Sequence, residues 1–216
     1  MSSDNLEYKN RIKQNESAAE AYTARKAKKN EAEMALVKKA FDRCENIETV
    51  LDAPCGVGRA TILLASMGFK ATGIDLGDGA VKVAQRELEK SGEKATIEVG
   101  NLESLHFGDQ AFSAVLCFRF YHHLPNNEIR QKVISELCRT AKDYVLISHF
   151  SPYSFTSIKR LIRDKLKIKR SIQHATTLAS LTKKFESCGY QLLEDIPQAR
   201  FFHTLHLAIY KKQYTL

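Results

Sequence analysis

The sequence predicts an α/β fold, in which an open and mostly parallel seven-stranded sheet carries helices on both faces. Three observations lead to this prediction. Short apolar runs of strand length alternate along the chain with longer segments of helical period. The first run, Val50–Asp52, enters a turn that contains Gly56 and Gly58, and the second run, Ala71–Asp75, ends in a carboxylate. The 216 residues, of which 44% are hydrophobic, are enough for one such domain and its core.

The elements are expected in a regular order along the chain. Strands are predicted at 50–52, 71–75, 95–99, 112–117, 144–147, 190–196 and 202–210. One helix follows the glycine-rich turn. Others are predicted over 78–90, after Asn126 as N-cap, and over 177–188 with Gly189 directly after its end. The segment Tyr144–Ile147 is almost continuously apolar, which is typical of a parallel strand that is buried on both faces.

The first 45 residues differ in composition and are predicted to form a helical extension to a domain that spans 46–216. They are rich in lysine, glutamate, alanine and asparagine and contain few large apolar residues. One or two helices are predicted within 15–44. The side chains expected to pack on the domain are Met34, Leu36, Val37, Ala40 and Phe41.

The glycine spacing after the first strand separates two classes of nucleoside cofactor. A dinucleotide site requires Gly-x-Gly-x-x-Gly, but Thr61 stands where its third glycine should be. The pattern acid-x-Gly-x-Gly-x-Gly fits from Asp52 to Gly58, with Pro54 in place of the first glycine. This run resembles the first motif of the class I S-adenosylmethionine (SAM) methyltransferases. Proline is tolerated there if the position donates no hydrogen bond and needs no positive φ. The carboxylate of Asp75 is the expected acceptor for the ribose hydroxyls.

The resemblance extends from about residue 50 to residue 211 and is closest to the small-molecule methyltransferases of ubiquinone and menaquinone biosynthesis. It implies a Rossmann-like fold with an antiparallel last strand, SAM as cofactor and S-adenosylhomocysteine as product. Gly100–Phe107 resembles the adenine-binding turn of the family, with Asn101 in place of the usual aspartate. An amide oxygen can still accept a hydrogen bond from the adenine amino group. The resemblance assigns the following residues to the cofactor: Asp52, Ala53, Pro54, Cys55, Gly56, Gly58, Asp75, Leu76, Asn101, Leu102 and Cys117.

A histidine pair follows the fourth predicted strand. The run Phe118–Pro125 resembles the His-His-Leu segment that lies beside the transferred methyl group in the family. Methyl transfer is an in-line displacement, so a base is needed only when the acceptor loses a proton, as a phenol or an alcohol does. His123 is the first candidate for this base and His122 the second, and a role for neither as a base stays open. Arg119 and Tyr121 are expected to bind the acceptor. A hydroxyl or phenol oxygen is favoured as the methylated atom over nitrogen or carbon.

A basic segment lies between the fifth predicted strand and the last predicted helix. Residues 155–170 contain seven lysines and arginines against the single Asp164, so most of the formal net charge of +8 lies here. Apolar residues at helical spacing indicate a basic amphipathic helix. One interpretation is an ordinary solvated surface helix. The other is a lid inserted at about 151–173, which suits an anionic amphiphilic acceptor or a peripheral contact with a membrane surface.

Other functions receive less support from the sequence. The fourth strand is not followed by the Asp/Asn-Pro-Pro-Tyr/Phe or Pro-Cys motifs of base methyltransferases, which argues against nucleic acid, although RNA methylation and a catalytically silent SAM-binding protein stay open. The five cysteines include no Cys-x-x-Cys pair, and His203 and His206 are expected on opposite faces of a strand, so no metal site is predicted.

No signal-peptide core or membrane-length apolar run is present, so a cytoplasmic location is expected, with peripheral contact at the inner face of a membrane as an option. The oligomeric state is left open.

Overall fold

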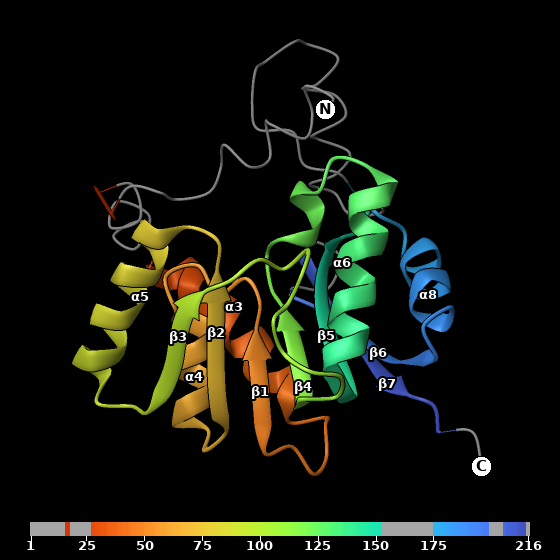
Figure 1. Ribbon diagram of the computed structural model, residues 1–216. Coiled ribbons are helices and arrows are strands. Elements are labelled where there is room, and N and C mark those ends of the chain that lie inside the picture. Colours follow the sequence, from red (N-terminus) through yellow and green to blue (C-terminus); the bar gives the residue numbers. More distant parts are fainter. Residues whose placement is uncertain (1–15, 18–26, 153–174, 199–204, 215–216) are drawn as a thin grey trace.

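The computed structural model contains one seven-stranded sheet with helices on both faces (Figure 1). It describes residues 16–17, 27–152, 175–198 and 205–214. The strands are β1 (Thr49–Asp52), β2 (Lys70–Asp75), β3 (Ala95–Val99), β4 (Phe112–Cys117), β5 (Ala141–Phe150), β6 (Tyr190–Pro197) and β7 (Leu205–Lys212). Their order across the sheet is β3-β2-β1-β4-β5-β7-β6. Strand β7 runs antiparallel to β5 and β6, whereas β1 to β5 pair in parallel. The predicted fold class, including the antiparallel last strand, is confirmed.

The helices lie where the periodicity predicts them. They are α3 (Ala27–Phe41), α4 (Arg59–Ser66), α5 (Asp78–Ser91), the short 3-10 turn η1 (Tyr121–His123), α6 (Asn127–Thr140) and α8 (Leu178–Glu186). The predicted cap of α6 is present, because the Asn126 side chain accepts a hydrogen bond from the Ile129 N–H at 2.9 Å. Gly189, just beyond α8, has the left-handed φ of 80° that favours glycine. Within the described ranges, no helix combines the length and the apolar character that crossing a membrane requires.

Two apolar clusters hold the helices against the sheet. On one face, α6 and α8 bury Leu137 and Phe185 against β5 through Val145. On the other face, α3 and α4 bury Val37 and Leu64, together with the next residue of β5. Neighbouring residues of β5 join opposite clusters because successive side chains of a strand point to opposite faces. Figure 1 shows α6 and α8 in front of the sheet, α3 and α4 behind it, and α5 beside the edge strand β3.

Strand β5 is longer than the sequence predicts. Its apolar run ends at Ile147, but pairing with β7 carries the strand on to Phe150. In this extension His149 lies opposite His206, and Phe150 lies opposite Leu205. Polar residues near the end of the strand hide the extension from an analysis of apolar runs. The predicted basic helix at 155–170, nearly all of the predicted lid, and His203 lie outside the described residues.

Helix α3 packs directly on the sheet. Leu36, Val37, Ala40 and Phe41 are buried in the second cluster, and Met34 packs against it. The Phe41 side chain is only 2% exposed, and its ring centroid lies 5.5 Å from that of Phe69. The burial of these side chains makes the N-terminal helix part of the hydrophobic core.

We expect Phe41→Ala to lower the free energy of unfolding by about 3–5 kcal/mol, because truncating a buried phenylalanine removes apolar contacts and leaves a cavity. The exposed Lys39 on the same helix supplies the control, since Lys39→Ala should change stability by less than about 0.5 kcal/mol. Urea unfolding of the two variants measures both effects. Equal stability of Phe41→Ala and Lys39→Ala would show that α3 is not part of the cooperative core.

Candidate active site

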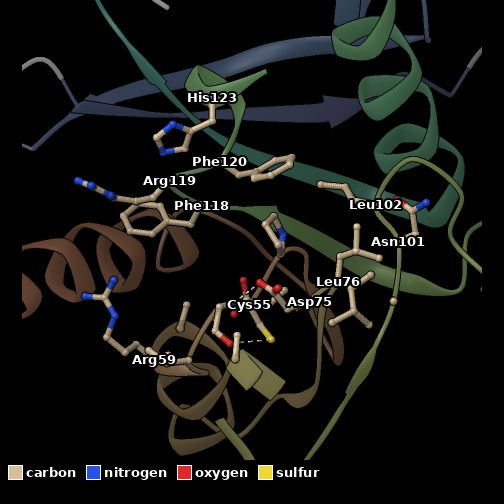
Figure 2. Close-up of a pocket in the computed structure, with 18 of the residues that line it drawn as sticks. Cys55, Arg59, Asp75, Leu76, Asn101, Leu102, Phe118, Arg119, Phe120 and His123 are labelled. Carbon is tan, nitrogen blue, oxygen red and sulfur yellow. Dashed lines mark hydrogen bonds between the residues drawn. The ribbon is translucent and has the colours of Figure 1, made fainter. Parts of the chain in front are cut away.

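A cavity of about 380 Å³ lies beyond the carboxyl ends of strands β1 to β4. This is where open parallel sheets bind ligands, because the loops that follow neighbouring strands diverge there. Of the residues predicted for the site, those that line the cavity are Asp52, Pro54, Cys55, Gly56, Asp75, Leu76, Asn101, Leu102, Arg119 and His123. Figure 2 shows His123 and Phe120 across the cavity from Cys55 and Asp75.

The glycine-rich turn brings bare backbone to the cavity wall. Gly56 and Gly58 have φ values of 58° and 80°, a left-handed conformation that side chains disfavour. A Cβ atom on Gly58 would also lie 3.0 Å from the Cβ atom of Ala84 in α5. The two glycines therefore differ in use: Gly56 lines the cavity, whereas Gly58 lets α4 begin close to α5. Pro54 follows a cis peptide bond and lines the cavity.

Asp75 is held by the backbone on both sides. One carboxylate oxygen accepts a hydrogen bond from the Gly56 N–H at 2.9 Å, and the other accepts from the Gly77 N–H at 2.8 Å. These bonds orient the carboxylate at the cavity wall and tie the end of β2 to the turn after β1. Each carboxylate oxygen has a second lone pair, so the group can still accept hydrogen bonds from a ligand.

Asp52 is a buried carboxylate at the end of β1. Its side chain accepts a hydrogen bond from the Thr61 hydroxyl at 2.7 Å, and the residue is 1% exposed. Burial raises the pKa of Asp52 to about 7, against the opposing effect of the Thr61 bond, and the nearby charge of Asp75 raises it further. Asp52 therefore changes charge near neutral pH, at the wall of the cavity.

The N-terminal helix reaches the cavity through a buried carboxylate that the sequence did not mark. Glu33 of α3 is 1% exposed and accepts hydrogen bonds from Arg119 at 2.7 Å and from Arg59 at 3.3 Å. Both arginines line the cavity, as does Met34. Arg119 also has a positive φ of 59°, and its N–H donates to the Ser148 hydroxyl at 2.6 Å. The carboxylate thus fixes two cationic side chains at one wall.

The two histidines of η1 have different surroundings. His123 lines the cavity. His122 is fully buried, and its ring stacks on Phe150 with the centroids 3.9 Å apart. Tyr121 is fully buried in the core, where burial raises the pKa of its phenol to about 12. Of the three predicted residues, only His123 can meet a ligand in this cavity directly.

Five predicted residues are not among those that line the cavity, and their direct contacts with a ligand stay predictions. Ala53 is buried, and its N–H donates to the Leu116 carbonyl at 2.9 Å, which continues the pairing of β1 with β4. Cys117, the last residue of β4, is fully buried in the first apolar cluster. The others are Gly58, Tyr121 and His122. Each of the five supports the wall from behind through backbone geometry or packing.

Other residues that line the cavity were not predicted from the sequence. Phe118 and Phe120 flank Arg119 on the wall, and an aromatic run directly after a strand was the signal that could have found them. Glu33 and Met34 carried no such signal, because they reach the site only through the packing of α3. Arg59 follows the glycine-rich turn directly, so its position could have been anticipated.

The fold also assembles a group of metal-ligand type outside this cavity, where the sequence predicted none. His149, Asp195 and His206 offer ligand atoms that all lie within 4.8 Å of one another. Burial opposes ionisation of Asp195, but hydrogen bonds from the two histidines outweigh it and hold the pKa of this carboxyl well below its usual range. The sequence prediction considered only the spacing of histidines within one strand, and it therefore did not bring these three residues together.

Comparison with known proteins supports the interpretation of the cavity. A family model described as a methyltransferase domain matches residues 50–144. A ubiquinone biosynthesis O-methyltransferase of Nitrosospira multiformis is 34% identical over 91 residues, which are 42% of this chain and 38% of that protein. One of Coxiella burnetii is 25% identical over 150 residues, or 67% of this chain and 64% of that protein. The chain thus spans less than two thirds of the length of these curated relatives.

Solved structures share the whole fold. A SAM-dependent methyltransferase of Methanosarcina mazei has a TM-score of 0.68 at 23% identity, covering 81% of this chain and 97% of that one. The magnesium protoporphyrin IX methyltransferase of Synechocystis, solved with bound S-adenosylhomocysteine, has a TM-score of 0.69 at 18% identity, covering 98% of this chain and 95% of that one. Residues 50–144 are thus similar to a methyltransferase domain, and the chain shares its α/β fold with SAM-dependent methyltransferases.

We expect SAM binding to weaken as the pH falls below about 7 and to level off above it. Below its pKa of about 7 Asp52 is protonated, whereas the positive sulfonium and ammonium groups of SAM favour its ionised form, so binding must release the proton. The loss approaches about tenfold per pH unit. Calorimetry between about pH 5.5 and 8.5 measures the slope. Asp52→Asn keeps an oxygen for Thr61 and should remove the dependence, and pH-independent binding by the wild type would contradict the assignment.

Proposed function

We propose that this chain transfers the methyl group of SAM to a small-molecule acceptor, at a hydroxyl or phenol oxygen. The observation that carries the proposal is the cavity itself, which has the oriented Asp75 carboxylate on one wall and the His123 imidazole across from it. The curated relatives support an oxygen acceptor, since they are named ubiquinone biosynthesis O-methyltransferases. When bound, SAM supplies an electrophilic methyl group on a sulfonium, and the protein residues bind and align the reactants.

The cofactor contacts follow from residues at the ends of β1 to β3. Asp75 accepts hydrogen bonds from the ribose hydroxyls through its remaining lone pairs. Asn101 and Leu102, after β3, bind the adenine. The Asn101 side-chain oxygen accepts from the Glu103 N–H at 2.9 Å, and this bond orients the amide. The backbone of Gly56 faces the amino-acid end of the cofactor, near the carboxylate of Asp52.

The acceptor is held at the opposite wall. Phe118 and Phe120 present aromatic surface there, which suits the ring of a phenol. His123 takes the acceptor proton, because an imidazole titrates near neutral pH and lies on the cavity wall. Removing the proton makes the oxygen a stronger nucleophile for the in-line displacement. Arg119, fixed by Glu33, favours an acceptor that carries negative charge.

A binding experiment tests the cofactor site. The wild type should bind SAM, and Asp75→Ala should bind it at least about tenfold more weakly, since each hydrogen bond to a charged acceptor contributes about 1.5–3 kcal/mol. Asp78→Asn is the control, because Asp78 begins α5, is exposed and pairs with Lys82 at 2.8 Å. Calorimetry that detects no SAM binding by the wild type would reject the proposed function.

A turnover experiment tests the base. On a phenolic acceptor, His123→Ala should lower kcat by about 10²–10⁴-fold and leave the affinity for SAM unchanged. Lys183→Ala, which removes an exposed side chain of α8 that does not line the cavity, is the control and should keep full turnover. If His123→Ala turns over as fast as the control, His123 is a wall of the pocket and not a base.

A further inference from the structure

Three side chains from the last three strands meet away from the cofactor cavity. They are His149 near the end of β5, Asp195 of β6 and His206 of β7. The His149 Nε2 atom lies 3.0 Å from one Asp195 oxygen, and the His206 Nδ1 atom lies 2.7 Å from the other. His149 is 1% exposed, and the side chains of Asp195 and His206 are 15% and 21% exposed. The cluster is therefore closed on the His149 side and open to water on the other.

The sheet register fixes this meeting. His149 and His206 are direct partners in the antiparallel pairing of β5 with β7, so their side chains project on the same face. Asp195 of β6 lies opposite Ala208 of β7, and Ala208 is two residues from His206 along the same strand. The Asp195 side chain therefore projects on the same face and can reach His206. The two histidines are 57 positions apart in the chain, and only the sheet brings them together.

The two ring nitrogens of His149 face different partners. Its Nδ1 atom lies 3.4 Å from the carbonyl oxygen of Thr176, and a carbonyl can only accept a hydrogen bond. Its Nε2 atom lies 3.0 Å from an Asp195 oxygen. A neutral imidazole carries one N–H, so without a metal ion it donates to only one of these two acceptors. A metal ion on Nε2 leaves the Nδ1 proton for the Thr176 carbonyl, and metal-binding histidines commonly donate the other ring N–H to a backbone carbonyl in this way.

A buried hydroxyl beside the cluster also supports a bound ion. The Thr176 side-chain oxygen is buried, and among the described residues it has no hydrogen-bond partner. Thr176 is 7% exposed and supplies the carbonyl that contacts His149. Buried polar atoms normally have partners, and a metal-bound water is a donor that this oxygen can accept from.

We propose that His149, Asp195 and His206 bind one divalent transition-metal ion of the zinc type, with water in the remaining position. Two imidazoles and a carboxylate form a donor set that zinc favours. Ligand atoms about 2.0–2.1 Å from a tetrahedral zinc ion lie about 3.3 Å apart. The pairs at 2.7 and 3.0 Å, which use different Asp195 oxygens, need to separate by about half an ångström. The ligand atoms all lie within 4.8 Å of one another, so the widest pair needs to approach by at most about 1.5 Å.

The metal ion ties together the chain on both sides of the segment between β5 and α8. The Thr176 N–H donates to the Phe150 carbonyl at 2.9 Å, so this residue is joined to β5 twice, the second time through His149. An ion held by β5, β6 and β7 therefore stabilises the contact of Thr176 with the end of β5. None of the three ligands lines the cofactor cavity, so metal binding is separate from SAM binding.

Zinc titration of the full chain against a chromophoric chelator tests the proposal. The wild type should bind one Zn²⁺ ion per chain, and His206→Ala and Asp195→Asn should each lose at least about 100-fold in affinity, since even the partners of ligands contribute about 10–100-fold. His106→Ala is the matched control, because His106 and Glu98 form a histidine–carboxylate pair at 2.9 Å that has no third metal-ligand residue within the described ranges. Zn²⁺ should raise the Tm of the wild type and the control but not of the two cluster variants. Co²⁺ in place of Zn²⁺ should show the strong visible absorption of a tetrahedral site.

Circular dichroism and SAM binding confirm that the variants are folded. If the wild type binds Zn²⁺ no more tightly than His206→Ala, or if His106→Ala loses as much affinity as His206→Ala, the metal site does not exist. In that case the cluster is a hydrogen-bonded His-Asp-His group without a metal ion. Because the assay measures metal affinity and Tm, it stands independently of methyl transfer.

Discussion

The parallel pairing of β1 with β2 and β4 is the constraint on which the rest of the site depends. It brings the carboxyl ends of these strands to one edge of the sheet, where each loop leaves in its own direction. The hydrogen bonds from Gly56 and Gly77 to Asp75 then join two of these loops. As a result, a carboxylate and a strip of bare backbone face one cavity in a fixed relation. Residues from the other loops add their side chains around this carboxylate and this backbone.

The N-terminal helix closes the frame from one side. Glu33 is buried, and a buried carboxylate is unfavourable unless charged or polar partners compensate for its lost hydration. Arg59 and Arg119 provide this compensation, one from the start of α4 and the other from the loop after β4. The same contact that satisfies the carboxylate fixes two cationic side chains at the cavity. Packing of α3 in the core and the electrostatics of the site are therefore linked.

The last strands use the sheet differently. Because β7 returns antiparallel beside β5, the start of β7 meets the end of β5, and His206 comes opposite His149. Asp195 joins them from β6. Within one strand, alternation separates neighbouring side chains to opposite faces, and that rule alone hid this cluster. Pairing between strands places residues that are distant in the sequence side by side. The spacing of residues along the sequence does not show which strands pair.

The sequence by itself determined the fold class, the order of the elements, the caps at Asn126 and Gly189, and the position of the glycine-rich turn after β1 and of the carboxylate at the end of β2. These features depend on local propensity and on periodicity, which neighbouring residues carry. Only the tertiary structure decided that His123 and not His122 reaches the cavity, and that Tyr121 and Cys117 lie behind the wall. The buried Glu33 and the cluster of His149, Asp195 and His206 were also decided there. Such contacts depend on how far a helix rotates and on which strands pair, and these are set by packing between segments that are distant in the chain.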